Sequence, residues 1–398
     1  MSVGARTSHL RRSNLALVLD QLRRRGPSSR SQLVAATGLT RSAIAGLVGE
    51  LEDLRLVIEG PSEPDGRPGR PSPVVRIDNR SVAVLAIEIF VDEIGVAIVA
   101  LDGSILGEER RSRPRARVAV AETISDVTAL VDLLDAASPH PRLIGCGASV
   151  AGLVRDVDGF VVAAPNLGWT DVPLAALLTA ALDRGLAVRV GNDADLGALA
   201  ESRSGAGVGS DHMVFVSGEV GVGGGLIVAG RPVVGHFGFA GEIGHMPVNP
   251  EGRQCRCGSI GCWETEVGER ALLARAGLDP DGGRSAVEEL LDRAAGADPA
   301  ALAALDGEAR WLAFGIAGLV NVLDLDTVVL GGLFARVLPA IRPQLDAELV
   351  RRRYLAAGRR VTVVGAALGA SAVTVGVAEL AFRSLLDDPA AVMNATFG

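Results

Sequence analysis

Short apolar runs that end at glycine constrain this fold more than any other feature of the sequence. Three such runs are followed by loops rich in glycine and small polar residues: Val188–Val190, His212–Ser217 and Thr327–Leu330. Val82–Ile89 and Gly95–Leu101 have the pattern of a hairpin-like pair of strands. Leu143–Ala148 is predicted to be a buried strand and Leu174–Leu182 a helix. This alternation of strands and helices is typical of an α/β fold whose functional loops lie at strand ends.

The first eighty residues have a different pattern, in which helices come first. Apolar side chains at helical spacing predict a helix over Ser13–Arg25. A short helix begins at Ser31, and Thr40 is placed to cap a third helix, which carries an apolar stripe: Ile44, Leu47, Val48, Leu51 and Leu54. Gly38 supplies the positive φ that the tight turn between the last two helices needs. Two helices joined by a glycine-containing turn predict a helix-turn-helix.

The third helix is the candidate DNA-reading element. In a helix-turn-helix the second helix of the motif enters the major groove with its N-terminal end first. We therefore expect Thr40, Arg41 and Ser42 to face DNA, with the hydroxyls on phosphate and Arg41 on phosphate or guanine. The alternative is a small helical bundle that binds protein.

The segment from Arg55 to Ile77 has the pattern of a two-stranded wing. Val57-Ile58 and Val74–Ile77 are the expected strands, and the tip contains Arg67 and Arg70, each beside glycine and proline. Proline keeps the tip extended and glycine adds no bulk, so both arginine side chains can enter a narrow minor groove. The alternative interpretation of this segment is a flexible linker between domains.

Charge is distributed unevenly along the chain. Residues 1–80 contain 13 arginines and 8 acidic residues, a net charge of +5, whereas the whole chain has −8, so the remainder has −13. A basic N-terminal part on an acidic body favours contact with phosphate through the N-terminal part. The N-terminus lacks the apolar region of a signal peptide, and the sequence shows no uninterrupted apolar run of about 18 residues. We expect a cytoplasmic protein without a membrane span.

Three of the four cysteines lie close together and follow a histidine. The predicted ligand set is three thiolates and one imidazole, which is typical of a structural zinc site: His245, Cys255, Cys257 and Cys262. Such tight clustering favours metal over disulfides and indicates a reducing compartment. Four protein ligands leave no open position, which disfavours catalytic Zn²⁺. The alternative is a group of buried cysteines without a ligand.

Amide and carboxylate side chains recur in loops flanked by glycine. The set is predicted to bind a polyol, because its members both donate to and accept from hydroxyl groups: Asn166, Asn192, Asp193, Glu242, His245 and Glu264. Each residue taken alone is equally a cap or turn residue, so the prediction rests on the whole set. The glycine-rich segment Gly218–Gly225 is a candidate phosphate-binding loop, a weak signal by itself.

From the helix-turn-helix to the C-terminus, the chain resembles the ROK family of repressors, open reading frames and sugar kinases. The most specific stretches are Ala164–Trp169, Asn192-Asp193-Ala194, Ala240–Met246, Cys255–Gly258 and Gly261–Glu264. The resemblance implies an actin-like ATPase (ribonuclease H-like) α/β fold in two lobes, with sugar held between them by the polar set. It implies a winged helix-turn-helix domain over residues 1–78 and a ROK sugar-binding domain over 79–398, with structural Zn²⁺ in the loop 245–264. In family kinases the aspartate that matches Asp193 is the catalytic base.

One segment departs from the family kinases. Their first strand is followed by a D-x-G-G-T loop that holds ATP phosphate, and here that place reads Glu88-Ile89-Phe90-Val91-Asp92. Bulk replaces glycine where backbone would approach phosphate, and Glu219 adds a negative charge at the second loop. Phosphoryl transfer depends on positioning and charge stabilisation. The sequence therefore predicts a sensor without kinase activity: a sugar-responsive DNA-binding regulator, favoured as a repressor of carbohydrate-use genes.

Two alternatives stay open at this point. One is an ATP-dependent sugar kinase with an added DNA-binding domain, which the retention of Asp193 favours. The other is a regulator whose body binds a protein, which retention of the whole polar set opposes. The regulator is expected to act as a homodimer or homotetramer on an inverted-repeat operator in double-stranded DNA. A monosaccharide or sugar phosphate is the expected effector, and the cysteine loop is expected to sense it, because that loop lies between His245 and Glu264.

Overall fold

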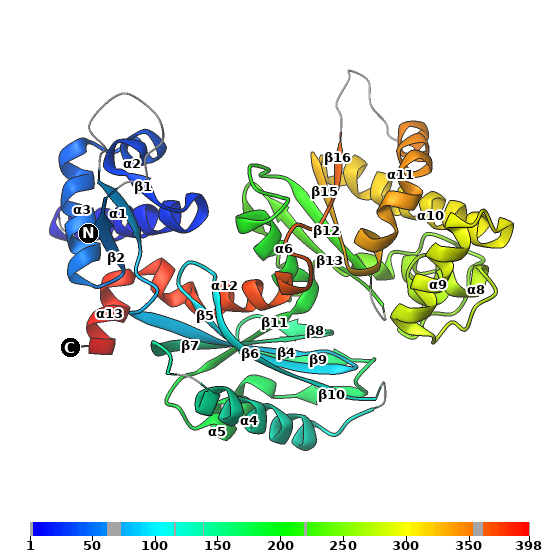
Figure 1. The fold of residues 1–398 in the computed structure, drawn as a ribbon, viewed down its shortest axis with the longest axis horizontal. Coiled ribbons are helices and arrows are strands. Elements are labelled where there is room, and N and C mark those ends of the chain that lie inside the picture. The colour runs from blue at the N-terminus through cyan, green and yellow to red at the C-terminus, as the bar shows by residue number, and fades with distance from the viewer. Residues whose placement is uncertain are drawn as a thin grey trace.

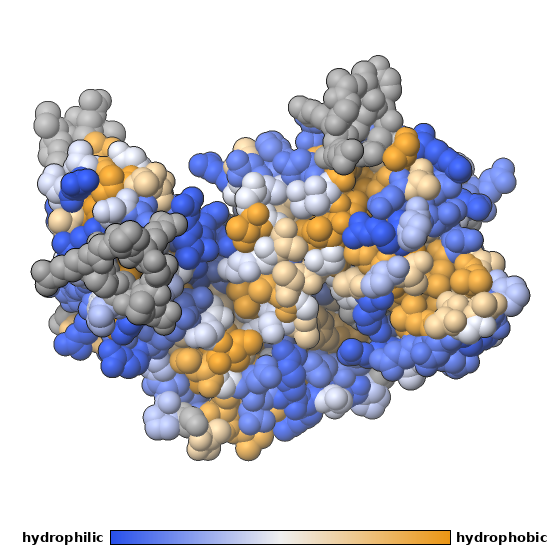
Figure 2. All heavy atoms as spheres, turned by 45° about the horizontal axis from the view of Figure 1, so that its top comes forward, coloured by the Kyte–Doolittle hydropathy of each residue, from blue (hydrophilic) through white to orange (hydrophobic). Residues whose placement is uncertain are grey.

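The computed structural model describes residues 3–61, 73–114, 117–137, 139–218, 221–352 and 361–397. Two sheet-containing lobes lie side by side, and an N-terminal domain packs beside the first of them (Figure 1). The space-filling view shows the N-terminal domain and the second lobe as separate masses at opposite ends, with a hollow between them (Figure 2). Of the predicted contact residues, Arg67 and Arg70 at the wing tip lie outside the described residues, as does Glu219.

In its described residues, the N-terminal domain contains three helices and a small antiparallel sheet with the order β1-β3-β2. Its elements are α1 (Val3–Arg25), β1 (Ser28–Ser29), α2 (Arg30–Thr37), α3 (Arg41–Asp53), β2 (Val57–Gly60) and β3 (Val74–Ile77). Thr40 caps α3 as predicted, because its Oγ1 accepts a hydrogen bond from the Ala43 amide at 3.2 Å. Gly38 has the expected positive φ of 70°. The predicted winged helix-turn-helix is confirmed.

The first lobe is built on a five-stranded sheet with the order β11-β7-β4-β5-β6. The strands are β4 (Val82–Ile89), β5 (Glu93–Ala100), β6 (Ile105–Ser112), β7 (Arg142–Val150) and β11 (Val188–Asn192). Residues along β4 alternate between two cores, because successive side chains of a strand point to opposite faces. Leu85 and Ile87 pack with α4 (Val120–Ala137) and α5 (Leu174–Leu182). Val84 on the opposite face packs with α12 (Ala372–Asp387).

A smaller sheet follows β7 in the chain. It has the order β10-β9-β8 and is formed by β8 (Leu153–Arg155), β9 (Phe160–Ala164) and β10 (Trp169–Val172). The turn between β9 and β10 contains Asn166.

The second lobe has its own five-stranded sheet, with the order β14-β13-β12-β15-β16. The strands are β12 (Met213–Gly218), β13 (Val222–Val228), β14 (Arg231–Pro232), β15 (Thr327–Gly331) and β16 (Thr362–Gly365). Its helices are η1 (Ile243–His245), α7 (Trp263–Glu266), α8 (Glu269–Arg275), α9 (Gly283–Ala295), α10 (Pro299–Leu323) and α11 (Gly332–Arg352). Helix α6 (Asp193–Ser204) leads from the first sheet into the second, and α12 returns along the first, preceded by η2 (Gly369–Ser371) and followed by α13 (Pro389–Phe397).

The glycine-rich segment Gly218–Gly225 differs from the predicted open loop. Residues from Val222 onward belong to β13, which pairs antiparallel with β12. A Cβ at Gly223 would lie 2.8 Å from the Ala194 Cβ, and one at Gly225 would lie 2.5 Å from the Ala198 Cβ. These glycines therefore let α6 pack closely on the sheet, and Val222–Gly225 are strand residues.

One described helical segment, Gly369–Asp387, is long and apolar enough to cross a membrane. It contains α12, whose apolar side chains pack between the first sheet and α6. Because 61% of its most apolar window is buried inside the protein, its composition is explained by its place in the core.

Candidate metal centre and ligand site

The four predicted metal ligands are brought together, as the sequence indicates. Their ligand atoms all lie within 4.8 Å of one another. The Sγ atoms of Cys257 and Cys262 are 3.6 Å apart, and the Cys255 Sγ lies 3.7 Å from the His245 Nδ1. Zn–S bonds of about 2.3 Å in a tetrahedron place neighbouring sulfurs about 3.8 Å apart. The donor set and its spacing therefore fit a tetrahedral metal ion.

Local backbone geometry holds these four residues in place. His245 ends η1, and Cys262 immediately precedes α7. Gly261 has a φ of 70°, and a Cβ there would lie 1.6 Å from the Asn249 carbonyl oxygen, so only glycine fits this part of the wrap.

His245 and Glu264 each face two neighbours. The His245 Nδ1 points toward Cys255, while its Nε2 lies 3.8 Å from the Glu242 Oε2. Glu264 accepts a hydrogen bond from the Cys255 thiol at 2.9 Å through Oε1, and its Oε2 accepts one from the Val222 amide at 3.5 Å. The cysteine loop (residues 245–264) is therefore linked directly to carboxylates of the predicted polar set.

Three carboxylates gather where α6 begins and η1 approaches it: Asp193, Asp195 and Glu242, called here the acid cluster. Burial raises the pKa of Asp193. Burial, with Asp193 and Glu264 adding to it and His245 opposing it, raises the pKa of Glu242. Burial together with the charges of Glu242 and Asp193 raises the pKa of Asp195 to about 8. Carboxylates whose charge the protein leaves uncompensated are candidates for accepting hydrogen bonds from a ligand.

The two asparagines of the polar set are positioned differently. Asn192 caps α6, since its Oδ1 accepts from the amides of Ala194 and Asp195, and its Nδ2 donates to the Gly152 carbonyl at 3.1 Å. Asn166 accepts a hydrogen bond from the Arg256 Nη1 at 3.0 Å. A Cβ at Gly221 would lie 3.1 Å from Glu264 and 3.7 Å from Asn166, so these two side chains share one neighbourhood.

Sequence reasoning missed two residues of this site. Asp195 stands two positions after Asp193, and the doubled acid at the start of a helix was the available signal. Arg256 lies between two predicted metal ligands, is exposed, and donates a hydrogen bond to Asn166. No local pattern distinguishes it from the other exposed arginines of the chain.

Polar groups of the segment Glu88–Asp92 have hydrogen-bond and ion-pair partners within the protein. Glu88 is 2% exposed and accepts a hydrogen bond from the Thr374 hydroxyl at 2.8 Å, and the Arg110 Nη2 lies 2.8 Å from its Oε2. Burial outweighs Arg110 and raises the pKa of Glu88. The Arg113 guanidinium donates to the carbonyl oxygens of Phe90 and Val91. Backbone groups at this turn therefore already have partners.

The predicted DNA-contact residues of α3 lie at the surface. Thr40, Arg41 and Ser42 are all exposed at the N-terminal end of the helix. The hydroxyls of Thr40 and Ser42 are 3.2 Å apart. This end of α3 is therefore accessible to a ligand that suits a helix N-terminus.

Comparisons with known proteins agree with this architecture. The model of the ROK family matches residues 84–384, and the model of the MarR family matches residues 16–68. The chain belongs to the ROK family. Its ROK-matching part contains both sheet-bearing lobes, the acid cluster and the cysteine loop.

Relatives match different lengths of this ROK chain. The xylose repressor of Bacillus subtilis is 28% identical over 386 residues, covering 95% of this chain and 97% of the relative. The glucokinase of Streptomyces coelicolor is 31% identical over 318 residues, covering 75% of this chain and 96% of the enzyme. The repressor therefore matches the N-terminal domain as well as the body.

Solved structures show the same division. A ROK family transcriptional regulator, described as a homologue of the E. coli MLC protein, has a TM-score of 0.78 at 23% identity, covering 97% of this chain and 98% of its own. A ROK family glucokinase from Streptomyces griseus in complex with glucose and AMPPNP has a TM-score of 0.65 at 29% identity, covering 76% of this chain and 99% of its own. The two-lobed fold predicted from the sequence is confirmed.

Proposed function

We propose that this protein is a sugar-responsive transcriptional repressor that acts in the cytoplasm on carbohydrate-use genes. The observation that carries the proposal is the joint presence of an exposed, capped α3 and of the acid cluster in one chain. A xylose repressor matches 95% of this chain, whereas a glucokinase matches 75%.

The proposed domains are the winged helix-turn-helix over residues 1–78 and the ROK sugar-binding domain over residues 79–398. The DNA-contacting residues are Thr40, Arg41 and Ser42 in the major groove, with Arg67 and Arg70 of the wing in the minor groove. One helix-turn-helix reads only a half-site. The active species is therefore a homodimer or homotetramer on an inverted-repeat operator.

The proposed sugar-binding residues are Asn166, Asn192, Asp193, Glu242, His245 and Glu264. Burial raises the pKa of Asp193 and of Glu242, and among the described residues neither has the arginine partner that Glu88 has. Sugar hydroxyls can donate hydrogen bonds to both carboxylates, which supports this assignment. Asn192 already uses its Oδ1 as a helix cap, so its contribution is restricted to the remaining N–H.

The proposed metal is a structural Zn²⁺ held by His245, Cys255, Cys257 and Cys262. The fit of the four donors to a tetrahedron supports it. The ion would fix the wrap of the cysteine loop, while the protein's own His245 and Glu264 present their other atoms toward Glu242 and Val222. Sugar contact at these side chains would be sensed by the loop.

The sensor is proposed to lack kinase activity. The buried Glu88–Arg110 ion pair and the Arg113 contacts occupy the groups that would have to turn toward ATP phosphate. Asp193 acts as a catalytic base only in the alternative, a sugar kinase with a DNA-binding domain. That alternative is favoured by its retention and by the glucokinase relatives.

Fluorescence anisotropy on DNA from the protein's own upstream region tests the proposal. The zinc-loaded protein is titrated with free and phosphorylated monosaccharides, including xylose and glucose, without ATP. We expect one of them to change DNA affinity tenfold, a coupling of about 1.4 kcal/mol. Tight DNA binding that no sugar alters would contradict a sugar sensor. ATP-dependent formation of sugar phosphate would establish the kinase alternative.

A further inference from the structure

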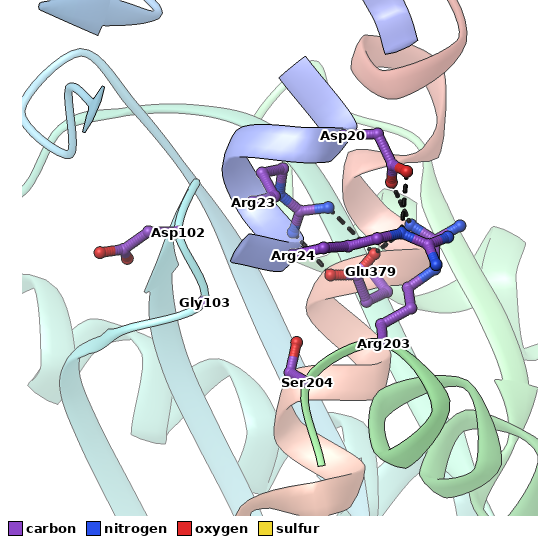
Figure 3. Close-up of a pocket in the computed structure, with 8 residues that line it drawn as sticks. All are labelled: Asp20, Arg23, Arg24, Asp102, Gly103, Arg203, Ser204 and Glu379. Atoms are coloured by element: carbon purple, nitrogen blue, oxygen red, sulfur yellow. Dashed lines mark hydrogen bonds and ion pairs between the residues drawn. The ribbon is translucent and has the colours of Figure 1, made fainter. Parts of the chain in front are cut away.

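A group of charged side chains joins the DNA-binding domain to both helices that connect the lobes. Its members are Asp20 and Arg23 of α1, Arg203 of α6 and Glu379 of α12, called here the α1 charge cluster. Figure 3 shows these side chains converging from three helices, next to the turn that contains Asp102 and Gly103. The first and last members are separated by more than three hundred positions in the chain.

The centre of the cluster is a buried bidentate ion pair. The Arg23 Nη2 and Nη1 donate to the Glu379 Oε1 and Oε2 at 2.6 and 3.0 Å, and both side chains are about 5% exposed. The Arg23 Nε also donates to the Leu101 carbonyl at 2.6 Å. Burial alone would raise the pKa of Glu379, but Arg23 and Arg203 outweigh it and hold the pKa below its ordinary value. This pair fixes α1 on α12.

Arg203 adds a separate connection from α6. Its Nη1 lies 2.9 Å from the Glu379 Oε2 and 3.4 Å from the Asp20 Oδ1. Asp20 also pairs with Arg24 at 2.8 Å, one turn along α1. One guanidinium of α6 therefore contacts both α12 and the DNA-binding domain.

Helix α6 carries the proposed sugar site at its other end. It begins at Asp193, capped by Asn192, and Arg203 lies ten residues later, about 15 Å along a helix of 1.5 Å per residue. The helix leads from β11 of the first sheet to β12 of the second, so a change in the angle between the lobes must move one of its ends.

Helices α6 and α12 also meet at close range. A Cβ at Gly376 would lie 2.1 Å from the Leu196 carbonyl oxygen, so the two backbones touch at this crossing. Glu201 of α6 accepts hydrogen bonds from the amides of Ala367 and Leu368, ahead of α12. Because the two backbones are in contact at this crossing, a displacement of α6 is transmitted to α12. The Arg203–Glu379 contact lies across the same pair of helices.

We propose that Arg203 is a positioning residue for the sugar response: it couples the orientation of α6, set by sugar at Asp193, to the orientation of α1 in the DNA-binding domain. This proposal rests on the proposed function and identifies the contacts through which sugar binding would reach the DNA-binding domain. The core of the N-terminal domain is continuous with α12 through apolar contacts. Such contacts hold the two parts together but do not by themselves fix their relative orientation. The α1 charge cluster is directional: the bidentate Arg23–Glu379 pair is satisfied in one orientation of α1 on α12, and the Arg203 Nη1 links α6 to both partners of that arrangement.

Arg203→Met tests the proposal. It keeps the aliphatic stem and leaves the Arg23–Glu379 pair intact, so Glu379 is not left buried without a cation. Arg203→Lys is the conservative rescue, and Arg310→Met on the exposed side of α10 is the matched control. Each protein is checked by thermal melting. DNA affinity is then measured without sugar and with xylose or glucose as the probe.

We expect wild type, Arg203→Lys and Arg310→Met to respond to the active probe by tenfold or more, and Arg203→Met by less than threefold with unchanged zinc content. Basal DNA affinity of Arg203→Met should also differ from wild type by at least threefold. Wild-type basal affinity together with a wild-type response in Arg203→Met would overturn the proposal. If no free or phosphorylated monosaccharide affects wild type, the sugar assignment fails, and the basal comparison alone decides whether Arg203 positions α1.

A second variant covers the case in which Arg203→Met melts early. Asp20→Asn breaks the same contact from the α1 side and leaves the buried pair untouched. Asp20→Asn alone should reduce the sugar response in the same direction as Arg203→Met. Where Arg203→Met stays folded, the double variant should respond like Arg203→Met, since the Asp20 contact is one of the two that Arg203 makes. Independent, additive effects of the two changes on DNA affinity would contradict a shared connection between α6 and α1.

Discussion

The acid cluster and the Glu88 segment are two polar sites of one fold, and they differ in how their charges are satisfied. Glu88 has Arg110 and Thr374 within 2.8 Å, so the protein provides its partners. Among the described residues, no arginine forms an ion pair with Asp193, Asp195 or Glu242, and the His245 Nε2 lies 3.8 Å from the Glu242 Oε2. A site that is internally satisfied has a structural role, whereas one left uncompensated is suited to a ligand. The comparison sets a position occupied by the protein's own partners apart from one whose carboxylates are open to a ligand.

Removing the metal should produce the largest effect. Cys257→Ser takes one of four ligands from the cysteine loop, and we expect loss of bound zinc, at least about 3 kcal/mol of destabilisation and loss of the sugar response, because metal binding and folding of such loops are coupled. Metal analysis and thermal melting measure this. Cys146→Ala, which changes the buried cysteine of β7 outside the ligand set, is the control and should retain zinc. A folded Cys257→Ser protein with a full sugar response would contradict the role given to the loop.

Glu242→Gln separates ligand binding from stability. The change keeps shape but removes the charge, and we expect sugar affinity to fall about 30-fold, or roughly 2 kcal/mol, with DNA affinity in the absence of sugar unchanged. Calorimetric titration of the sugar measures it. Glu288→Gln on the exposed side of α9 should behave as wild type. Unchanged sugar affinity in Glu242→Gln would remove the acid cluster from the site.

Arg110→Met should have the opposite profile. It leaves Glu88 buried without its cation, and we expect a loss of about 1 to 2 kcal/mol, less than for a fully buried pair because Arg110 is 30% exposed. Sugar affinity should stay within twofold of wild type. Denaturant unfolding and sugar titration together check both expectations. Loss of sugar binding without loss of stability would reverse the roles assigned to the two sites.

The smallest effect is expected for Asp195→Asn, which should change how the stability of the protein depends on pH. Its pKa is raised to about 8 in the folded protein, so the folded state keeps a proton that the unfolded chain releases near pH 4. Stability from this group is therefore present below pH 4 and is lost as the pH rises toward 8. Because Asp195→Asn has no carboxyl group to ionise, it avoids this loss of stability at high pH. We expect its melting temperature to exceed that of wild type by about 3 °C at pH 8 and to match it more closely at pH 5. An equal difference at both pH values would contradict the raised pKa.

How far each part could be predicted depends on how local its determinants are. All four metal ligands lie within residues 245–264, so spacing alone indicated the site. Thr40 and the apolar stripe of α3 are equally local. By contrast, the Arg23–Glu379 pair joins residues 356 positions apart, and the Glu88–Thr374 bond joins residues 286 apart. No local sequence pattern predicts contacts between residues so far apart in the chain.

Glycine explains why the extent of the Gly218–Gly225 loop was overestimated from the sequence. A run such as Gly223-Gly224-Gly225 is compatible with an open loop or with a strand under close contact, and only the position of α6 distinguishes them. The two-residue strand β1 was missed for a different reason, since Ser28 and Ser29 are too few to show any alternation.

The most direct test of the separation between the two sites is a titration of sugar into the protein–operator complex, in parallel with and without Mg-ATP. Anisotropy reports DNA release, and product analysis reports phosphate transfer. The account predicts that one sugar changes DNA affinity tenfold or more, that ATP leaves this change unaltered, and that no sugar phosphate forms. A sugar effect that appears only with ATP, or accumulation of sugar phosphate, would contradict it.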